Sequence, residues 1–260
     1  MERPVTTAPL LMTRALTKTF RGLVALRDHS IVVEPGEIVG VIGPNGSGKS
    51  TMFNCVTAFT RPTSGAIEFQ GRSLVGKSPT AIAELGIART FQGSRLFTSL
   101  SVFDNVAAAA GLRHGVNLLD AVLGTPRLHR QAAAVRAFAE ELIDLVGLMP
   151  QRDRTAGDLP YGDQRRLEIA RALGTKPRLL MLDEPAAGLN SSETAALLQL
   201  IRTIRDRYQV AVIVVEHDMD LIMNLCERIQ VLATGSVIGE GTPAEVQASP
   251  VVREAYLGHA

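Results

Sequence analysis

The stretch that decides the fold of this chain is Gly43-Pro44-Asn45-Gly46-Ser47-Gly48-Lys49-Ser50. It fits the pattern G-x-x-x-x-G-K-S, in which the glycines let backbone N–H groups close around phosphate. A short apolar run, residues 38–42, precedes it, and residues 50–58, which contain no Gly or Pro, follow it. This order of strand, loop and helix brings the positive end of a helix to the phosphates. The stretch therefore predicts a binding site for a nucleoside triphosphate.

Side chains that suit triphosphate chemistry lie in the loop and after a second apolar run. Lys49 is placed to reach the β- and γ-phosphates, and Ser50 to ligate Mg²⁺. Asp183 and Glu184 follow the apolar residues 179–182, at the end of a predicted core strand, where open α/β sheets bind ligands. Asp183 is suited to hold Mg²⁺, and Glu184 is suited to polarise the water that attacks the γ-phosphate. Alone, such an acidic pair equally suits a helix N-cap; beside a phosphate loop, the catalytic interpretation is favoured.

Two further polar residues are candidates for the same site. His217 follows the apolar residues 210–215 and Glu216, so it should leave the same sheet edge as Asp183 and could donate to the γ-phosphate. Taken alone, a single histidine is more often structural. Gln92 lies in a loop between the predicted sheet core and a helical region, where it could contact Mg²⁺ or the attacking water.

The periodicity of the apolar residues predicts an α/β fold. The predicted strands of a small antiparallel sheet are residues 10–20 and 25–33, and residues 66–69 are predicted as another short strand. Residues 131–149 carry apolar side chains mostly three and four apart, as in an amphipathic helix. Beyond residue 178, the apolar strands 179–182, 210–215 and 229–232 alternate with the predicted helices 191–207 and 218–226. Such alternation indicates a parallel sheet covered by helices on both faces.

The composition excludes several classes of protein. The 260 residues carry 27 Lys and Arg against 26 Asp and Glu, which disfavours nucleic acid as the main partner. The longest apolar runs fall short of the roughly 18 residues of a membrane span. Cys55 and Cys226 show no metal-ligand spacing, which favours two reduced structural thiols. Residues 1–14 lack the pattern of a secretory signal, so the cytoplasm is the expected compartment.

The spacing of these motifs resembles the ATP-binding cassette (ABC) family over nearly the whole chain. The resemblance implies a P-loop NTPase core of RecA-like type, with an antiparallel β subdomain and a helical subdomain. We expect one ABC ATPase domain over residues 1–260. Its expected parts are a core with the antiparallel β subdomain (1–91 and 159–234), a helical subdomain (92–158) and a C-terminal tail (235–260).

The resemblance also implies roles for individual residues, with ATP and Mg²⁺ as ligands. Phe20 falls where the family stacks an aromatic ring on adenine, and residues 159–166 fall where it carries its LSGGQ signature. The expected nucleotide-binding residues are Phe20, Val24, Gly43, Asn45, Gly46, Ser47, Gly48, Lys49, Ser50, Thr51, Tyr161 and Gly162. The expected metal ligands are Ser50, Gln92 and Asp183. The expected catalytic residues are Lys49, Gln92 (the Q-loop), Glu184 and His217 (the switch histidine).

In that family two cassettes meet head to tail, with each ATP between the phosphate loop of one and the signature of the other. This chain departs from the pattern, because Pro160 replaces the signature serine and offers neither a hydroxyl nor an N–H. Tyr161 and Asp163 replace a glycine and a glutamine, and Asn190 stands where many cassettes have Asp. A contact from the Gly162 N–H remains available. A cassette that binds ATP but hardly hydrolyses it is therefore one alternative.

One branch of the family shares these departures. The patterns L-x-Y-G-x-Q-R-R-L-E-I-A-R-A-L, E-P-A-A-G-L-N and V-E-H-D-M, the tail A-Y-L-G and the extended segment 111–130 resemble the ATP-binding subunits of branched-chain amino acid importers. The resemblance implies a second cassette as homodimer or related heterodimer partner, integral membrane permease subunits and, indirectly, a periplasmic substrate-binding protein. It also implies a peripheral position on the cytoplasmic face of the cell membrane. The alternatives are the ATPase of a lipopolysaccharide or other lipid exporter and a soluble, non-transport cassette.

The segment 92–106 is the candidate seat for the membrane partner. It mixes Leu96, Phe97 and Leu100 with small polar residues, as a groove for a short partner helix does. A loop packed on its own helical subdomain explains the pattern equally well. We expect part of the 46% hydrophobic composition to be exposed in the isolated chain.

Overall fold

A computed structural model describes residues 8–93, 95–112 and 126–257. Internal contacts divide the chain into two units. The first unit contains Met1–Ile87, Arg178–Pro185 and Ile201–Ala260, and the second contains Ala88–Pro177 and Ala186–Leu200.

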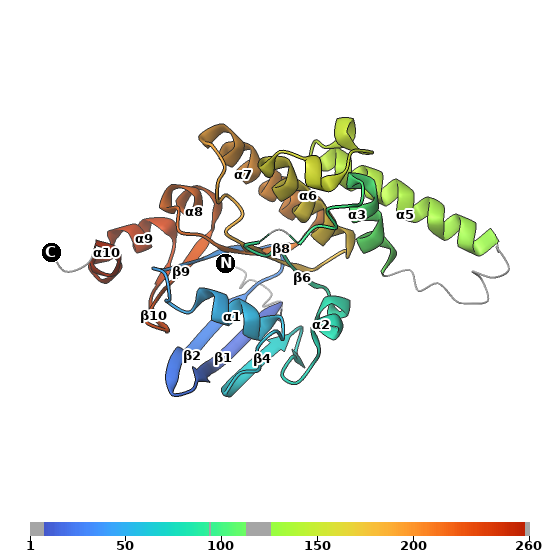
Figure 1. The fold of residues 1–260 in the computed structure, drawn as a ribbon. Coiled ribbons are helices and arrows are strands. Elements are labelled where there is room, and N and C mark those ends of the chain that lie inside the picture. The colour runs from blue at the N-terminus through green and yellow to red at the C-terminus, as the bar shows by residue number, and fades with distance from the viewer. Residues whose placement is uncertain (1–7, 94, 113–125, 258–260) are drawn as a thin grey trace, which may run out of the picture. The chain divides into compact units, whose positions relative to one another are not determined.

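The first unit contains an antiparallel sheet with the strand order β2-β1-β4-β5 (Figure 1). Its strands are β1 (Leu11–Phe20), β2 (Leu23–Val33), β4 (Ser64–Phe69) and β5 (Arg72–Ser73). A hairpin turn at Arg21 and Gly22, both with positive φ, joins β1 to β2. The predicted small antiparallel sheet is confirmed.

The main sheet has six strands in the order β10-β9-β3-β8-β7-β6. Its strands are β3 (Ile38–Ile42), β6 (Ile87–Arg89), β7 (Leu179–Asp183), β8 (Ala211–Val215), β9 (Arg228–Ala233) and β10 (Ser236–Gly241). β3 pairs in parallel with β8 and β9, β7 pairs in parallel with β8, and β10 is antiparallel to β9. Every residue of β3, β7 and β8 is buried, which explains their nearly continuous apolar sequences.

The helices of the first unit are α1 (Lys49–Val56), α2 (Pro79–Leu85), α8 (Met219–Leu225), α9 (Pro243–Ala248) and α10 (Pro250–Leu257). Phe53 of α1 and Phe69 of β4 share a hydrophobic core with Met181 and Ile213 of the main sheet. This core therefore packs α1 between the two sheets. α9 and α10 contact β10 and follow it at the C-terminal end of the trace in Figure 1.

The second unit is mainly helical, with α3 (Val102–Gly111), α5 (Pro126–Leu145), α6 (Tyr161–Gly174) and the 3-10 helices η1 (Met149–Gln151) and η2 (Ala156–Asp158). α3 lies beside both α5 and α6 (Figure 1). A Cβ added at Gly174 of α6 would lie 3.0 Å from the Ala109 side chain of α3, so the glycine permits this close approach. α7 (Ser191–Tyr208) begins in the second unit and ends in the first.

The helix predicted over residues 131–149 is wrong at both ends. α5 begins at Pro126 and ends at Leu145, because Gly147 takes a φ of 71° and turns the chain out of the helix. The N–H of Leu148 then donates to the Ile143 oxygen at 2.9 Å, and Met149 lies in η1 with 37% of its surface exposed. Of the segment 111–130, residues 113–125 lie outside the described residues, as do residues 1–7 and 258–260 of the two tails.

Within the ranges that the structure describes, none of the helices combines the length and the apolar character that crossing a bilayer requires.

The burial of His29 in β2 should make the free energy of unfolding depend on pH. Its side chain is fully buried, with Nδ1 3.2 Å from the Thr13 hydroxyl, and burial lowers its pKa from 6.5 to about 4. As the pH falls from 6.5 toward 4, the unfolded chain therefore takes up the proton first, and the free energy of unfolding falls by up to about 3 kcal/mol. Urea unfolding at several pH values checks this dependence.

The contribution of His29 is isolated by comparing variants. His29→Gln should flatten the pH dependence of the free energy of unfolding in this window relative to wild type. Equal slopes for wild type and His29→Gln would contradict the assignment.

Candidate functional site

The glycine-rich loop lies between β3 and α1, as the sequence predicts. Ser47 closes the loop on itself, since its N–H donates to the Pro44 oxygen at 3.1 Å. Its own backbone oxygen accepts from the Gly235 N–H at 3.0 Å, which ties the loop to the turn after β9. Gly48 is the N-cap of α1, so the first N–H groups of that helix open onto the loop.

The polar atoms of the loop suit an anionic ligand. The Lys49 side chain is 6% exposed, and its Nζ donates to the Gly43 oxygen at 2.6 Å and to the Pro44 oxygen at 3.0 Å. Burial lowers the pKa of Lys49, while the charges of Glu184 and Asp183 act in the opposite direction. The Ser47 hydroxyl is buried with no hydrogen-bond partner. A cation and an unused hydroxyl inside a loop of backbone donors fit phosphate.

The backbone conformation at position 48 requires a glycine, so substitution of Gly48 should destabilise the fold. Its φ is +108°, and an added Cβ would lie 2.8 Å from the Ala25 oxygen of β2. Gly48→Ala should therefore lower the free energy of unfolding by about 3 kcal/mol, since it adds a clash with backbone to a strained φ.

The matched control for this prediction is Gly46→Ala. Gly46 has a φ of +79°, but an added Cβ would meet nothing within 4 Å. Gly46→Ala should therefore lower the free energy of unfolding by only about 1–2 kcal/mol, the cost of the backbone strain alone. Urea unfolding without nucleotide measures both variants, and an equal loss in the two would show that the contact with β2 is unimportant.

The predicted acidic pair ends β7 at the same sheet edge as the loop. Asp183 is 5% exposed and pairs with Val215, the last residue of β8. The Glu184 N–H donates to the Val215 oxygen at 2.9 Å, and Glu184 takes a φ of +47°, which is unusual for a residue with a side chain. Such backbone strain is typical of functional sites. The parallel strands β3, β7 and β8 thus deliver the loop, Asp183 and Glu184 to one edge.

His217 leaves that edge two residues beyond β8, as predicted. Its ring is 63% exposed, and its Nδ1 lies 3.6 Å from the carboxylate of Glu216. Glu216 is 1% exposed and accepts a hydrogen bond from the His217 N–H at 3.2 Å. Glu216 is therefore placed to orient the histidine, a role that the sequence analysis did not assign. The sequence feature that could have identified Glu216 is its position as an acidic residue directly after a buried strand.

The tip of the β1–β2 hairpin carries the aromatic candidate. Phe20 is 45% exposed, with Lys18 Nζ 4.7 Å from its ring centre, and Val24 of β2 is partly buried. Leu23, which pairs with Phe20, is 72% exposed. The tip therefore presents an apolar surface of the kind on which a base can stack.

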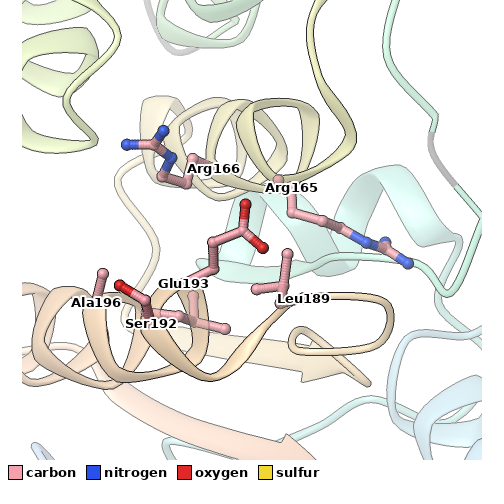
Figure 2. A pocket seen from close by; sticks show the side chains of 8 residues that line it. Arg165, Arg166, Leu189, Ser192, Glu193 and Ala196 are labelled. Atoms are coloured by element: carbon pink, nitrogen blue, oxygen red, sulfur yellow. The ribbon is translucent and has the colours of Figure 1, made fainter.

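Gln92, Tyr161 and Gly162 belong to the second unit. Pro160 is the N-cap of α6. It makes no side-chain capping hydrogen bond, because a proline side chain has no hydrogen-bonding group. A Cβ added at Gly162 would lie 3.0 Å from a carboxylate oxygen of Glu193 in α7. Figure 2 shows Glu193 pointing from α7 toward α6 in a cavity of about 170 Å³.

Asn190 caps α7 by a reciprocal pair of hydrogen bonds. Its side-chain oxygen accepts from the Glu193 N–H at 3.0 Å, and its own N–H donates to the Glu193 carboxylate at 2.9 Å. The amide that departs from the family's aspartate thus has a local structural role as an N-cap.

Arg165 is a buried residue of α6 that the sequence analysis did not single out. Its Nη1 donates to the Phe91 oxygen and to Glu168, each at 3.0 Å, and its Nη2 donates to the Gln92 oxygen at 2.8 Å. Burial acts to lower the pKa of Arg165, but Glu168 and the Tyr161 hydroxyl raise it above its usual value. The backbone of Gln92 is therefore held from α6.

The candidate docking segment is partly buried. Leu96 is 8% exposed, whereas Phe97 and Leu100 are 53% and 38% exposed. The Phe97 ring lies under Arg171 of α6, 5.2 Å from ring centre to guanidinium. Two apolar side chains of this segment are thus available at the surface of the second unit.

Comparison with known proteins identifies the family. The sequence profile of the ABC transporter family matches residues 26–187, which include the phosphate loop, Asp183 and Glu184. The chain belongs to the ABC transporter family. A second profile, described as branched-chain amino acid ATP-binding cassette transporter, matches residues 236–260 of this ABC chain. The predicted family and the α/β fold of an ABC ATPase are confirmed.

Individual relatives of this ABC chain match over nearly its whole length. It is 42% identical to the high-affinity branched-chain amino acid transport ATP-binding protein LivG of Salmonella typhimurium, over 97% of this chain and 99% of LivG. The solved ADP conformation of MJ1267, an ATP-binding cassette of an ABC transporter, matches with a TM-score of 0.83 and 28% identity, over 97% of this chain and 100% of that one. The dimeric cassette MJ0796 bound to ADP and Pi matches with a TM-score of 0.77 and 25% identity, over 90% of this chain and 98% of that one.

Proposed function

We propose that this chain is the ATP-hydrolysing subunit of an ABC importer for branched-chain amino acids. The observation that carries the proposal is the 42% identity to LivG over 97% of the chain, together with the branched-chain amino acid profile at residues 236–260. The second match matters because it lies in the tail, outside the part of the chain that the general ABC profile covers.

ATP binds at the phosphate loop of the first unit. Lys49 exchanges its loop carbonyl contacts for phosphate oxygens, and the N-terminus of α1 adds positive potential. The Ser47 hydroxyl has a free hydrogen-bonding capacity that supports this arrangement. Phe20 and Val24 receive the base at the hairpin tip. The remaining contacts of the loop come from Gly43, Asn45, Gly46, Gly48, Ser50 and Thr51.

Hydrolysis proceeds by attack of water on the γ-phosphorus. Glu184 accepts a proton from that water as the new P–O bond forms, and the bond to the β-phosphate oxygen breaks to give ADP and phosphate. His217, oriented by Glu216, donates a hydrogen bond to the γ-phosphate and so stabilises the charge that develops there. Gln92 contributes to positioning the attacking water.

Mg²⁺ fits the residues present, since the candidate ligands are a hydroxyl, a carboxylate and an amide oxygen. These are the oxygen donors that this cation prefers. Ser50, Asp183 and Gln92 would hold the ion, and Asp183 stands at the end of β7, at the sheet edge that carries the loop. Bound Mg²⁺ neutralises charge on the phosphate oxygens.

The working assembly contains two cassettes and membrane subunits. Support for the pair comes from the solved dimer of MJ0796, and in this chain the α6 N-terminus, with Tyr161 and Gly162, is the part that meets the partner's ATP. The exposed Phe97 and Leu100 form the seat of a permease helix, within a helical subdomain of residues 92–158. The core of 1–91 and 159–234, with the tail 235–260, completes the cassette. The chain then lies on the cytoplasmic face of the membrane, and a periplasmic binding protein delivers the amino acid.

Purification from native membranes tests the assembly. The tagged chain should copurify with integral membrane permeases and with a second cassette, identical or related, in a complex that hydrolyses ATP. Copurification with ribosomes or with a lipid-export complex would overturn the proposed function.

A further inference from the structure

Tyr161 replaces a glycine of the family signature, and its side chain is engaged within the second unit. Its ring packs on the loop before α7, because a Cβ added at Gly188 would lie 3.0 Å from Cε1 of the tyrosine. Its hydroxyl oxygen accepts hydrogen bonds from Arg165, from Nε at 3.0 Å and from Nη2 at 2.6 Å. One side chain thus contacts two other parts of the unit.

Arg165 extends this contact to the segment that carries Gln92. Besides the tyrosine, the guanidinium donates to the backbone oxygens of Phe91 and Gln92 and to Glu168, and it is only 5% exposed. Glu168 in turn accepts from the Arg95 N–H at 3.1 Å. The face of α6 therefore holds three backbone groups, the oxygens of Phe91 and Gln92 and the N–H of Arg95.

We propose that Tyr161 is a positioning residue, which acts through Arg165 to fix the backbone of Gln92 to the start of α6. The inference rests on the proposed function, in which Gln92 takes part in hydrolysis and α6 meets the ATP of the partner cassette. A displacement at the start of α6 is then passed to Gln92 through direct hydrogen bonds.

The chemistry of the three side chains explains why this link needs a tyrosine. The glycine of the family pattern has neither a ring to pack on Gly188 nor a hydroxyl to accept from Arg165. The hydroxyl receives two donors of the planar guanidinium, which fixes the plane of Arg165 and so the direction of its bonds to the two carbonyls. The side-chain hydroxyl of Tyr161 thus serves Arg165, while the backbone of the α6 N-terminus at Tyr161 and Gly162 remains the part that meets the partner's ATP in the proposed function.

The test uses Tyr161→Phe, Arg165→Lys and the double variant, each in the full-length chain. Tyr161→Phe keeps the ring on Gly188 and removes only the hydroxyl, and a lysine cannot reproduce the fork of donors. Arg166→Lys is the matched control. Arg166 is the next residue of α6 but bonds to Asp163 and to the Val146 oxygen, and Figure 2 shows it extending in the opposite direction from Arg165.

Two readouts are needed, hydrogen exchange in the free chain and steady-state hydrolysis in the assembled transporter. In Tyr161→Phe and Arg165→Lys, hydrogen exchange of the Arg95 amide should be faster by about fivefold or more. The acceptor of this amide is the Glu168 carboxylate, which the guanidinium of Arg165 fixes only while the Tyr161 hydroxyl holds that guanidinium in place. Exchange of the Phe97 amide, which donates to Asn105 at 2.9 Å, should be unchanged. The kcat should fall about fivefold to tenfold with KM for ATP unchanged, and the double variant should lose no more than Arg165→Lys alone.

Several results would overturn the inference. A raised KM with unchanged kcat in Tyr161→Phe would mean that the tyrosine contacts the nucleotide directly. Losses that add in the double variant, an unchanged Arg95 exchange rate, or faster exchange with an unchanged kcat would each exclude a positioning role. Failure of the proposed function is recognised separately, because the wild-type complex would then show no hydrolysis stimulated by branched-chain amino acids, whatever the exchange rates in the free chain.

Discussion

Glu184→Gln is expected to lower ATP turnover by about a thousandfold while ATP binding is retained. The amide has nearly the shape of the carboxylate but cannot accept the proton of the attacking water. One contact that places residue 184 is a backbone one, from its N–H to the Val215 oxygen at 2.9 Å, and the substitution leaves this bond intact. The variant also removes one negative charge beside the phosphates. We therefore expect it to accumulate as an ATP-bound dimer.

Two measurements check this result: single-turnover hydrolysis and the elution volume of the chain with and without ATP. The control is Glu227→Gln, which neutralises an acidic residue that is 53% exposed and paired with Arg205. That control should hydrolyse ATP at the wild-type rate and show no change in oligomeric state. Hydrolysis by Glu184→Gln at the wild-type rate would remove Glu184 from the role of general base.

Lys49→Ala is expected to weaken ATP binding by about a hundredfold or more and to abolish hydrolysis at ordinary ATP concentrations. The ammonium is 6% exposed and already lies inside the loop, on the Gly43 and Pro44 oxygens. Its loss leaves the ligand's negative charge without its nearest cation. This effect acts on binding, unlike the change at Glu184.

Calorimetric titration with ATP checks this prediction. Lys77→Ala is the matched control, because Lys77 is an exposed lysine of the same unit that lies outside the loop. Its affinity for ATP should equal that of wild type. An affinity of Lys49→Ala within about fivefold of wild type would contradict the binding mode.

The fold was predictable from the sequence wherever one local pattern dominated. The buried strands β3, β7 and β8 are continuous apolar runs, and the glycine-rich loop follows β3 within one residue. β10 was missed, because none of its residues is fully buried and its sequence shows no alternation. The end of α5 was also missed, since the apolar spacing continues to Met149 while the backbone turns at Gly147.

The residues of the candidate site were likewise predictable only where a local pattern marked them. Lys49, Asp183, Glu184 and His217 were found because each stands next to a core strand or inside the loop. Arg165 was not found, since its partners Phe91 and Gln92 lie more than 70 positions away in the chain, and no local pattern records such a contact. The one local signal was Tyr161 four residues before it, a spacing that places both side chains on one face of a helix.

The central claim is that this chain hydrolyses ATP to drive import of branched-chain amino acids. It is tested most directly in liposomes that contain the chain, the permeases that copurify with it and the binding protein that delivers substrate to them. The account predicts that leucine, isoleucine or valine with the binding protein stimulates ATP hydrolysis and drives amino acid uptake, and that Glu184→Gln abolishes both. Hydrolysis that does not respond to these amino acids, or that responds to lipopolysaccharide instead, would contradict it.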